Sequence, residues 1–167
     1  INASLNLPQG ISADAAGNLY FADNATYVRK IDTNGIITRF AGNGSPLALG
    51  DGGLALSSGM TPTFTAVDRE GNVYIADTGG NRIRKVNPAG NITTVAGNGN
   101  AAYVDHANAT SGSFNGPTGI AFDSSGNLYI ADTTNRLIRK VAVDGDGIDG
   151  DAGETLSTFA GSAPTSA

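Results

Sequence analysis

Carboxylates at a repeated position are the residues of this chain whose type and spacing could do chemistry. One carboxylate closes each of three similar apolar runs, LYFAD, VYIAD and LYIAD; these residues are Asp23, Asp77 and Asp132. A carboxylate at the mouth of a turn can bind a ligand, or it can accept backbone N–H groups and organise the loop. All three copies carry it, whereas catalytic sites break local symmetry. We therefore expect a structural role, in which the carboxylates pair with the repeated arginines (Arg29, Arg84 and Arg139) or with a neighbouring repeat.

Catalytic chemistry has few other candidates. His106 is the only histidine, so a Ser-His-Asp triad would have to use it, and no Gly-x-Ser-x-Gly nucleophile elbow occurs. The absence of cysteine excludes disulfides, thiol catalysis and Cys-based zinc sites. We expect His106 to be an exposed loop residue and the chain to be non-catalytic.

A second group of carboxylates stands in the third repeat. The segment 144–154, DGDGIDGDAGE, replaces the NPAGN of the second repeat and supplies Asp144, Asp146, Asp149, Asp151 and Glu154. Clustered carboxylates on a Gly-rich backbone suit Ca²⁺, although an EF-hand loop would place an oxygen donor where Ile148 stands. The segment therefore fits either a Ca²⁺ site or a solvated acidic loop. No cofactor is required by the repeated core, so we expect Ca²⁺ removal to leave most of the stability unchanged.

The elements that must position these residues repeat along the chain. GNLYFADNATYVRKI (17–31) returns as GNVYIADTGGNRIRKV (71–86) and as GNLYIADTTNRLIRKV (126–141). A fixed period of this kind is the signature of a repeat architecture. We divide the single domain 1–167 into units at about 1–44, 60–99 and 115–162, joined by loops at 45–59 and 100–114.

Each unit is predicted to form four strands. The runs are short, rich in β-branched and aromatic residues, and bounded by Gly, Asn, Asp and Pro, and no helix is predicted. The turns DAAG (14–17), DREG (68–71) and DSSG (123–126) place Asp and Gly as a type I turn with a bulge requires. The first two strands are apolar at successive positions, which indicates a sheet covered on both faces. The expected fold is all-β: a β-propeller with three four-stranded antiparallel blades in this chain.

The pattern resembles the NHL-repeat β-propellers, especially a bacterial type with blades of about 55 residues and a Gly-Asp-Gly-Gly inter-blade loop, here 50–53. The resemblance covers essentially the whole chain. It implies a scaffold, a sensor, a ligand binder, or a lyase or lactonase of a related propeller. The family's Asn-His-Leu is represented by NRI (81–83) and NRL (135–137), and by TYV (26–28) in the first blade, so any role of that motif's histidine is absent.

Strand alternation predicts which residues share a face of the propeller. The second-to-third turns and the inter-blade loops lie at the same end of the antiparallel strands. We therefore place on one face Asp23, Asp77, Asp132, Asp51, Asp105 and His106. This face is built from the longest loops, where binding surfaces commonly lie. We predict that it binds a protein or a small ligand.

Composition limits the partners. The net charge is −5 and the basic residues are scattered, so nucleic acid is not expected to bind. No run of about 18 apolar residues could span a bilayer, and no charged-then-apolar leader is present. The first residue is Ile1 rather than Met, which is expected of a processed protein or a piece of a longer one. Asn-x-Ser/Thr sequons permit glycosylation, and we expect an extracellular or periplasmic location.

The number of blades predicts that this chain packs against further blades. Propellers typically close with about four to eight blades, so three units correspond to half of a six-bladed ring. The first and third blades would each expose an apolar face, which we expect to bind a second copy of the chain or the remaining blades of a longer chain. The predicted function is a non-catalytic binding or assembly module outside the cytoplasm. The alternatives are a fragment of a metal-assisted lyase or lactonase, or a structural subunit of an extracellular filament or array.

Overall fold

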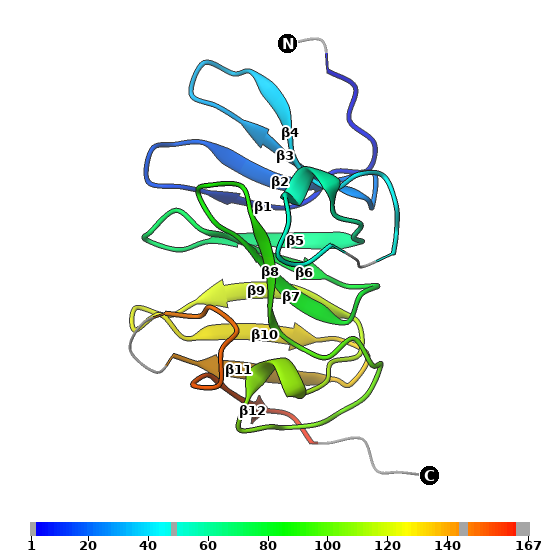
Figure 1. Ribbon diagram of the computed structural model, residues 1–167, viewed down its shortest axis with the longest axis vertical. Helices are drawn as coiled ribbons and strands as arrows, with labels where there is room; N and C mark the ends of the chain where they lie inside the picture. Colours follow the sequence, from blue (N-terminus) through cyan, green and yellow to red (C-terminus); the bar gives the residue numbers. More distant parts are fainter. Residues whose placement is uncertain (1–2, 48–49, 144–146, 163–167) are drawn as a thin grey trace.

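Three four-stranded antiparallel sheets make up the computed structural model, which describes residues 3–47, 50–143 and 147–162 (Figure 1). Blade 1 contains β1 (Gln9–Ala13), β2 (Leu19–Asp23), β3 (Tyr27–Ile31) and β4 (Ile37–Ala41). Blade 2 contains β5 (Pro62–Val67), β6 (Val73–Asp77), β7 (Arg82–Val86) and β8 (Ile92–Ala96). Blade 3 contains β9 (Pro117–Phe122), β10 (Leu128–Asp132), β11 (Leu137–Ala142) and β12 (Thr155–Ala160). Each strand pairs with the next one in sequence, so the predicted all-β fold is confirmed.

The first turn of each blade forms as its sequence predicts. In blade 1 the Asp14 side chain accepts the N–H groups of Ala16 and Asn18, at 3.0 and 2.8 Å. Gly17 follows with φ +90°, a conformation that side chains other than glycine rarely adopt. The turn in blade 3 repeats this arrangement around Asp123. The hairpins are therefore specified locally, by residues within the turns.

The inter-blade loops contain two short 3₁₀ helices, which the sequence analysis did not predict. They are η1 (Ala55–Ser57) and η2 (Ala109–Ser111). The Asn108 side chain caps η2 by accepting the N–H of Thr110 at 2.9 Å. A single turn is too short to produce a helical period in the sequence, so the expectation of no helix is wrong here.

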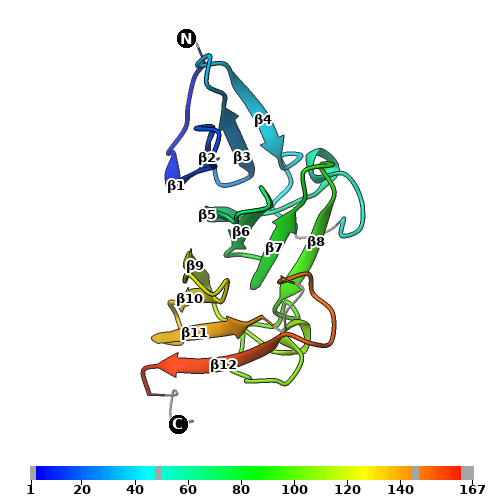
Figure 2. The ribbon, with the colours of Figure 1, turned by 90° about the vertical axis from the view of Figure 1, so that its left-hand side faces the viewer.

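The blades stack against one another, and the apolar core lies between them. Figure 2 shows β1, β5 and β9 along one side of the stack, with β4 and β8 on the other side. Tyr74 of blade 2 packs edge-on against Phe122 of blade 3, with ring centroids 4.8 Å apart. Between blades 1 and 2, the Ser12 and Thr65 hydroxyls lie 2.7 Å apart, and Thr65 also donates to the carbonyl of Tyr20. The seams are therefore both apolar and hydrogen-bonded.

Blade 1 and blade 3 lie at opposite ends of the stack (Figure 1). Several large apolar side chains of these blades are exposed: Leu7, Ile11, Ile138 and Phe159. Within the described part of the chain, no helix has the length and apolar character needed to cross a membrane.

Candidate functional site

The loop face is the side of the stack that carries the β2–β3, β6–β7 and β10–β11 turns and the inter-blade loops. On it, Arg84 of β7 joins two of the carboxylates predicted to share this face. Its Nε and Nη2 donate to Asp51 Oδ1, at 3.1 and 2.7 Å, and its Nη1 lies 3.6 Å from Asp77 Oδ2. Nη1 also donates to the carbonyl of Gly59 at 3.1 Å. The arginine therefore ties the preceding inter-blade loop to the end of β6.

Arg139 makes the equivalent arrangement in blade 3. Its Nη1 donates to Asp132 Oδ2 at 3.0 Å, and its Nη2 donates to Asp105 of the loop between blades 2 and 3. The carbonyls of Val104 and Ser113 accept its remaining hydrogen bonds. We call each group, an arginine with the carboxylate that ends the second strand and the carboxylate of the preceding loop, a loop anchor.

A bulge in the third strand places each of these arginines. The register between third and fourth strands shifts between Ile83 and Arg84 in blade 2 and between Ile138 and Arg139 in blade 3. The same shift precedes Arg29 in blade 1. Because a bulge re-aims the side chain that follows it, the arginine can reach the loop face.

The carboxylates that end the second strands are buried, and in Asp77 one oxygen, Oδ2, accepts no hydrogen bond and has only the ion pair with Arg84. Asp77 Oδ1 accepts the N–H of Thr61 at 2.8 Å, and Asp132 Oδ1 accepts that of Asn115 at 2.7 Å. Burial raises the pKa of Asp77, although the Thr61 N–H and Arg84 act in the opposite direction. The predicted pairing of these carboxylates with arginines is present. This arrangement holds the loops, and its buried members offer no surface to a ligand.

Blade 1 has an incomplete loop anchor. Arg29 Nη1 donates to Asp23 Oδ2 at 3.2 Å, and Asp23 Oδ1 accepts the N–H of Asn6. The Arg29 side chain is 21% exposed, compared with 1% for Arg84. Among the described residues, no second carboxylate pairs with Arg29. Its guanidinium is partly exposed, so a further acceptor can reach it.

His106 belongs to the inter-blade loop that lies on the same face. It is exposed, and its Nδ1 accepts the N–H of Asn108 at 3.0 Å. Its backbone exchanges two hydrogen bonds with Leu156, which fastens the loop to β12. The structure thus places His106 as a loop residue beside Asp105, and the ligand-binding role of this face stays a prediction.

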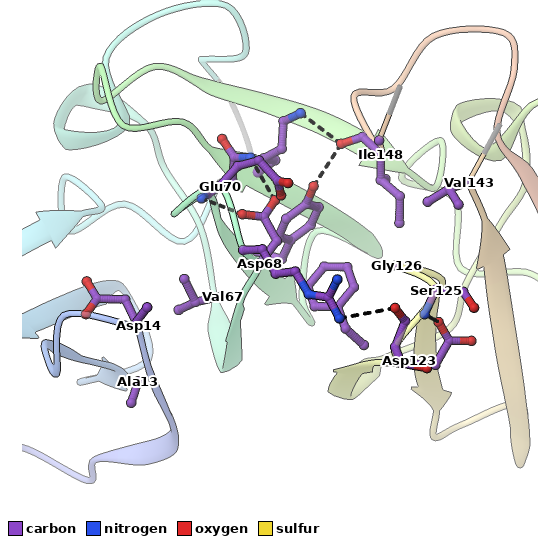
Figure 3. A pocket seen from close by; sticks show the side chains of 18 residues that line it. Ala13, Asp14, Val67, Asp68, Glu70, Asp123, Ser125, Gly126, Val143 and Ile148 are labelled. Carbon is purple, nitrogen blue, oxygen red and sulfur yellow. Dashed lines mark hydrogen bonds between the residues drawn. The ribbon is translucent and has the colours of Figure 1, made fainter. Parts of the chain in front are cut away.

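The opposite side, which we call the turn face, carries the first-to-second and third-to-fourth turns and contains a cavity of about 660 Å³. Figure 3 shows Asp14, Asp68 and Asp123, one from each blade, around this cavity, together with Ile148 from the insertion. Sequence reasoning missed this cavity, because it favoured the face with the longest loops. The repeated Asp-x-x-Gly turns were the signal that three carboxylates meet there.

The carboxylates around the cavity are engaged in their own turns. Although burial acts to raise it, hydrogen bonds from Asn18 and Tyr20 lower the pKa of Asp14. Asn127 lowers the pKa of Asp123 in the same way. Burial and the nearby Asp14 carboxylate raise the pKa of Tyr20 to about 12, so its hydroxyl remains a donor at neutral pH. The hydrogen bonds of these groups stabilise the turns that carry them.

The acidic insertion of blade 3 brings three carboxylates together on the turn face. One oxygen from each of Asp149, Asp151 and Glu154 lies within 4.8 Å of the others. The other two acidic residues named from the sequence, Asp144 and Asp146, lie outside the described residues. The described part of the insertion therefore concentrates negative charge at one point.

Comparison with known proteins identifies the repeat. The family description Teneurin NHL domain matches residues 1–48, and the description NHL repeat matches residues 60–86 and 114–141. Teneurin-3 of Danio rerio is 30% identical over 156 residues, which cover 83% of this chain and 6% of teneurin-3. The chain thus spans a small part of the curated relative that it matches.

Solved structures share the fold. A structural genomics protein of unknown function from Bacteroides thetaiotaomicron matches with a TM-score of 0.69 at 23% identity, over 93% of this chain and 36% of that one. A streptogramin B lyase structure matches with a TM-score of 0.61 at 17% identity, over 95% of this chain and 42% of that one. Neither match distinguishes the bacterial type of the family, which stays a prediction. Three four-stranded blades repeat in phase along the chain, and both matching family descriptions are NHL descriptions. The chain is therefore an NHL-repeat domain built from three blades of the β-propeller type.

Proposed function

We propose that this chain is a non-catalytic binding or assembly module, and that the outward face of blade 1 binds another four-stranded blade. The observation that carries the proposal is an apolar groove beside the incomplete loop anchor of Arg29. The groove is lined by Leu5, Pro8, Gln9, Gly10, Ile11, Phe21 and Ile31. A partner blade would cover the groove and supply the missing acceptor.

Strand alternation indicates that this groove faces away from blade 2. Ser12 bonds to Thr65 of blade 2, so its neighbour Ile11 points to the opposite side of the sheet. Ile11 is 59% exposed. Exposed apolar patches of this kind mark interaction sites, because burying them stabilises by about 25 cal/mol per Å².

The two complete loop anchors indicate which group a partner would contribute to Arg29. In blades 2 and 3 the arginine receives a carboxylate from the inter-blade loop that precedes its own blade, Asp51 or Asp105. A further blade followed by such a loop would supply both an apolar face and a carboxylate for Arg29. A second copy of this chain would cover the groove with the outward face of its blade 3, where Ile138 and Phe159 are exposed. Either occupant restores blade-to-blade packing.

Sedimentation velocity at micromolar concentration tests the proposal. We expect the wild-type chain to self-associate with concentration, and Ile11→Asp to abolish this association. Ile36→Asp is the matched control, because Ile36 is 58% exposed but lies in the β3–β4 turn rather than on the blade face. Self-association that survives Ile11→Asp, or a well-folded monomer that unfolds cooperatively at all concentrations, would overturn the proposal.

A location outside the cytoplasm is part of the same proposal, and the sequons that permit glycosylation are what supports it. The similarity to streptogramin B lyase, at 17% identity, concerns the fold and brings no reaction to this chain.

A further inference from the structure

The insertion between β11 and β12 differs from the equivalent hairpins of the other two blades. In blade 1 this hairpin is closed by Asp32, whose Oδ1 accepts the N–H groups of Asn34 and Ile36. In blade 2 the uncharged Asn87 does the same by accepting the N–H of Asn91 at 3.0 Å. The hairpin therefore needs one oxygen acceptor and no negative charge. The three carboxylates in blade 3 exceed what the turn requires.

The spacing of the three carboxylates suits one coordination sphere. Ca²⁺ binds oxygen ligands at about 2.3–2.6 Å, so two ligands on opposite sides of the ion lie about 5 Å apart. The chosen oxygens of Asp149, Asp151 and Glu154 all lie within 4.8 Å of one another. In the described part of the chain, none of the three forms an ion pair. The neighbouring cation, Lys85, donates to the carbonyl of Ile148 rather than to any of the three carboxylates.

Glu154 provides a separate indication of a missing partner. The residue is fully buried, and its Oε1 accepts the N–H groups of Asp149 and Gly150. Its Oε2 is buried and accepts no hydrogen bond. A buried carboxylate oxygen without a donor costs free energy, and a cation is a partner that would satisfy it.

The backbone that carries these residues is already docked on blade 2. Ile148 is buried, and its carbonyl accepts hydrogen bonds from Tyr74 Oη at 2.9 Å and from Lys85 Nζ at 2.8 Å. Gly150 approaches β8 so closely that a Cβ there would lie 2.5 Å from the carbonyl of Thr94. Because both contacts hold the segment next to the carboxylates, little ordering remains to be done when an ion binds.

We propose that Asp149, Asp151 and Glu154 bind one Ca²⁺ ion, which fastens the insertion of blade 3 over the seam with blade 2. Further ligands come from backbone carbonyls or water, since Ca²⁺ takes about six to eight oxygens. Carboxylate ligands select a hard cation, and Ca²⁺ accepts a wider range of coordination geometries than Mg²⁺, which demands a near-ideal octahedron.

Terbium luminescence tests the site, with Tb³⁺ as the probe for Ca²⁺. Tyr74 contacts Ile148, beside Asp149, and can transfer excitation to a bound ion. We expect Tb³⁺ emission excited through tyrosine, displaced by Ca²⁺ at lower concentration than by Mg²⁺. Glu154→Gln and the double variant Asp149→Asn/Asp151→Asn should each weaken Tb³⁺ binding at least about tenfold.

Asp32→Asn is the matched control, since it changes a carboxylate in the equivalent hairpin of blade 1 and should bind Tb³⁺ as the wild type does. In the double variant, the asparagines at 149 and 151 keep the Oδ1 atoms that accept the N–H groups of residues 151 and 153. The double variant should therefore fold, which far-UV circular dichroism would show. If Glu154→Gln unfolds, the double variant alone decides. Wild-type affinity in the double variant, equal weakening by Asp32→Asn, or no tyrosine-excited emission at millimolar Tb³⁺ would each overturn the proposal.

Discussion

Loss of Arg84 should test the loop anchor most directly. We expect Arg84→Met to lower the free energy of unfolding by about 3–5 kcal/mol, because it leaves the Asp77 carboxylate buried without its counter-charge. The side chains of Arg84 and Asp77 are 1% and 0% exposed, so water does not replace the lost partner. Met retains most of the aliphatic volume, which limits any cavity. Against a total stability of about 5–15 kcal/mol, this loss would lower the melting temperature by about 6–20 °C.

The pH dependence of the same variant gives a second measurement. Burial already raises the pKa of Asp77, and Arg84 is one of the groups that act to lower it. A buried acid whose folded pKa is raised loses stability as the pH rises through that pKa, and regains it as the pH falls. The difference between Arg84→Met and the wild type should therefore shrink as the pH falls toward the unfolded pKa of an aspartate, because protonation removes the uncompensated charge of Asp77. Urea unfolding followed by far-UV circular dichroism measures both quantities.

Two further variants serve as controls for Arg84→Met. Adding Asp77→Asn should recover part of the lost stability, because the uncompensated charge is then removed. Arg29→Met should cost less than Arg84→Met, since Arg29 is 21% exposed and holds no preceding loop in the described chain. A loss below about 1 kcal/mol for Arg84→Met, within the range of an exposed ion pair, would refute the anchoring role.

Other substitutions probe the remaining parts of the structure. His106→Ala should change the free energy of unfolding by less than about 1 kcal/mol in urea and leave any activity of the preparation intact, because the side chain is exposed and makes one hydrogen bond; a collapse in turnover would show that the loop is catalytic. Gly10→Ala should destabilise the chain by about 1–3 kcal/mol in the same assay, because its Cβ would lie 2.5 Å from the Phe64 ring in blade 2; an unchanged stability would mean that this seam is loose. Asp14→Asn should make the free energy of unfolding fall less steeply below about pH 4. The reason is that an acid with a lowered folded pKa stabilises the fold above its unfolded pKa and loses that contribution as the pH falls. An unaltered acid transition would contradict the stabilising role of Asp14 in its turn.

Much of the fold was predictable because its determinants are local. The hairpins depend on contacts such as those of Asp14 with Asn18, four residues away, so the turn sequence contains the whole interaction. The period of the repeat then places strands of the same kind in each blade. The pairing of Asp77 with Arg84 was also within reach, since the two residues lie close in sequence on adjacent strands. Single-turn 3₁₀ helices leave no such trace, and they were missed.

Contacts between distant segments were decided by the tertiary structure alone. Asp51 and Arg84 are 33 residues apart, and the bulge that aims the arginine depends on the register of two whole strands. The cavity of the turn face exists because turns from three separate blades converge, although each turn was predictable by itself. The burial of Glu154 and of Ile148 in the acidic insertion was likewise decided by the tertiary structure, where Ile148 accepts a hydrogen bond from Tyr74 of blade 2. Sequence by itself determined the repeat, its strands and its turns, because these arise from neighbouring residues. Only the stacking of the blades decided which charged side chains are buried, paired or left without a partner, because the desolvation of a charge depends on the groups that surround it in space.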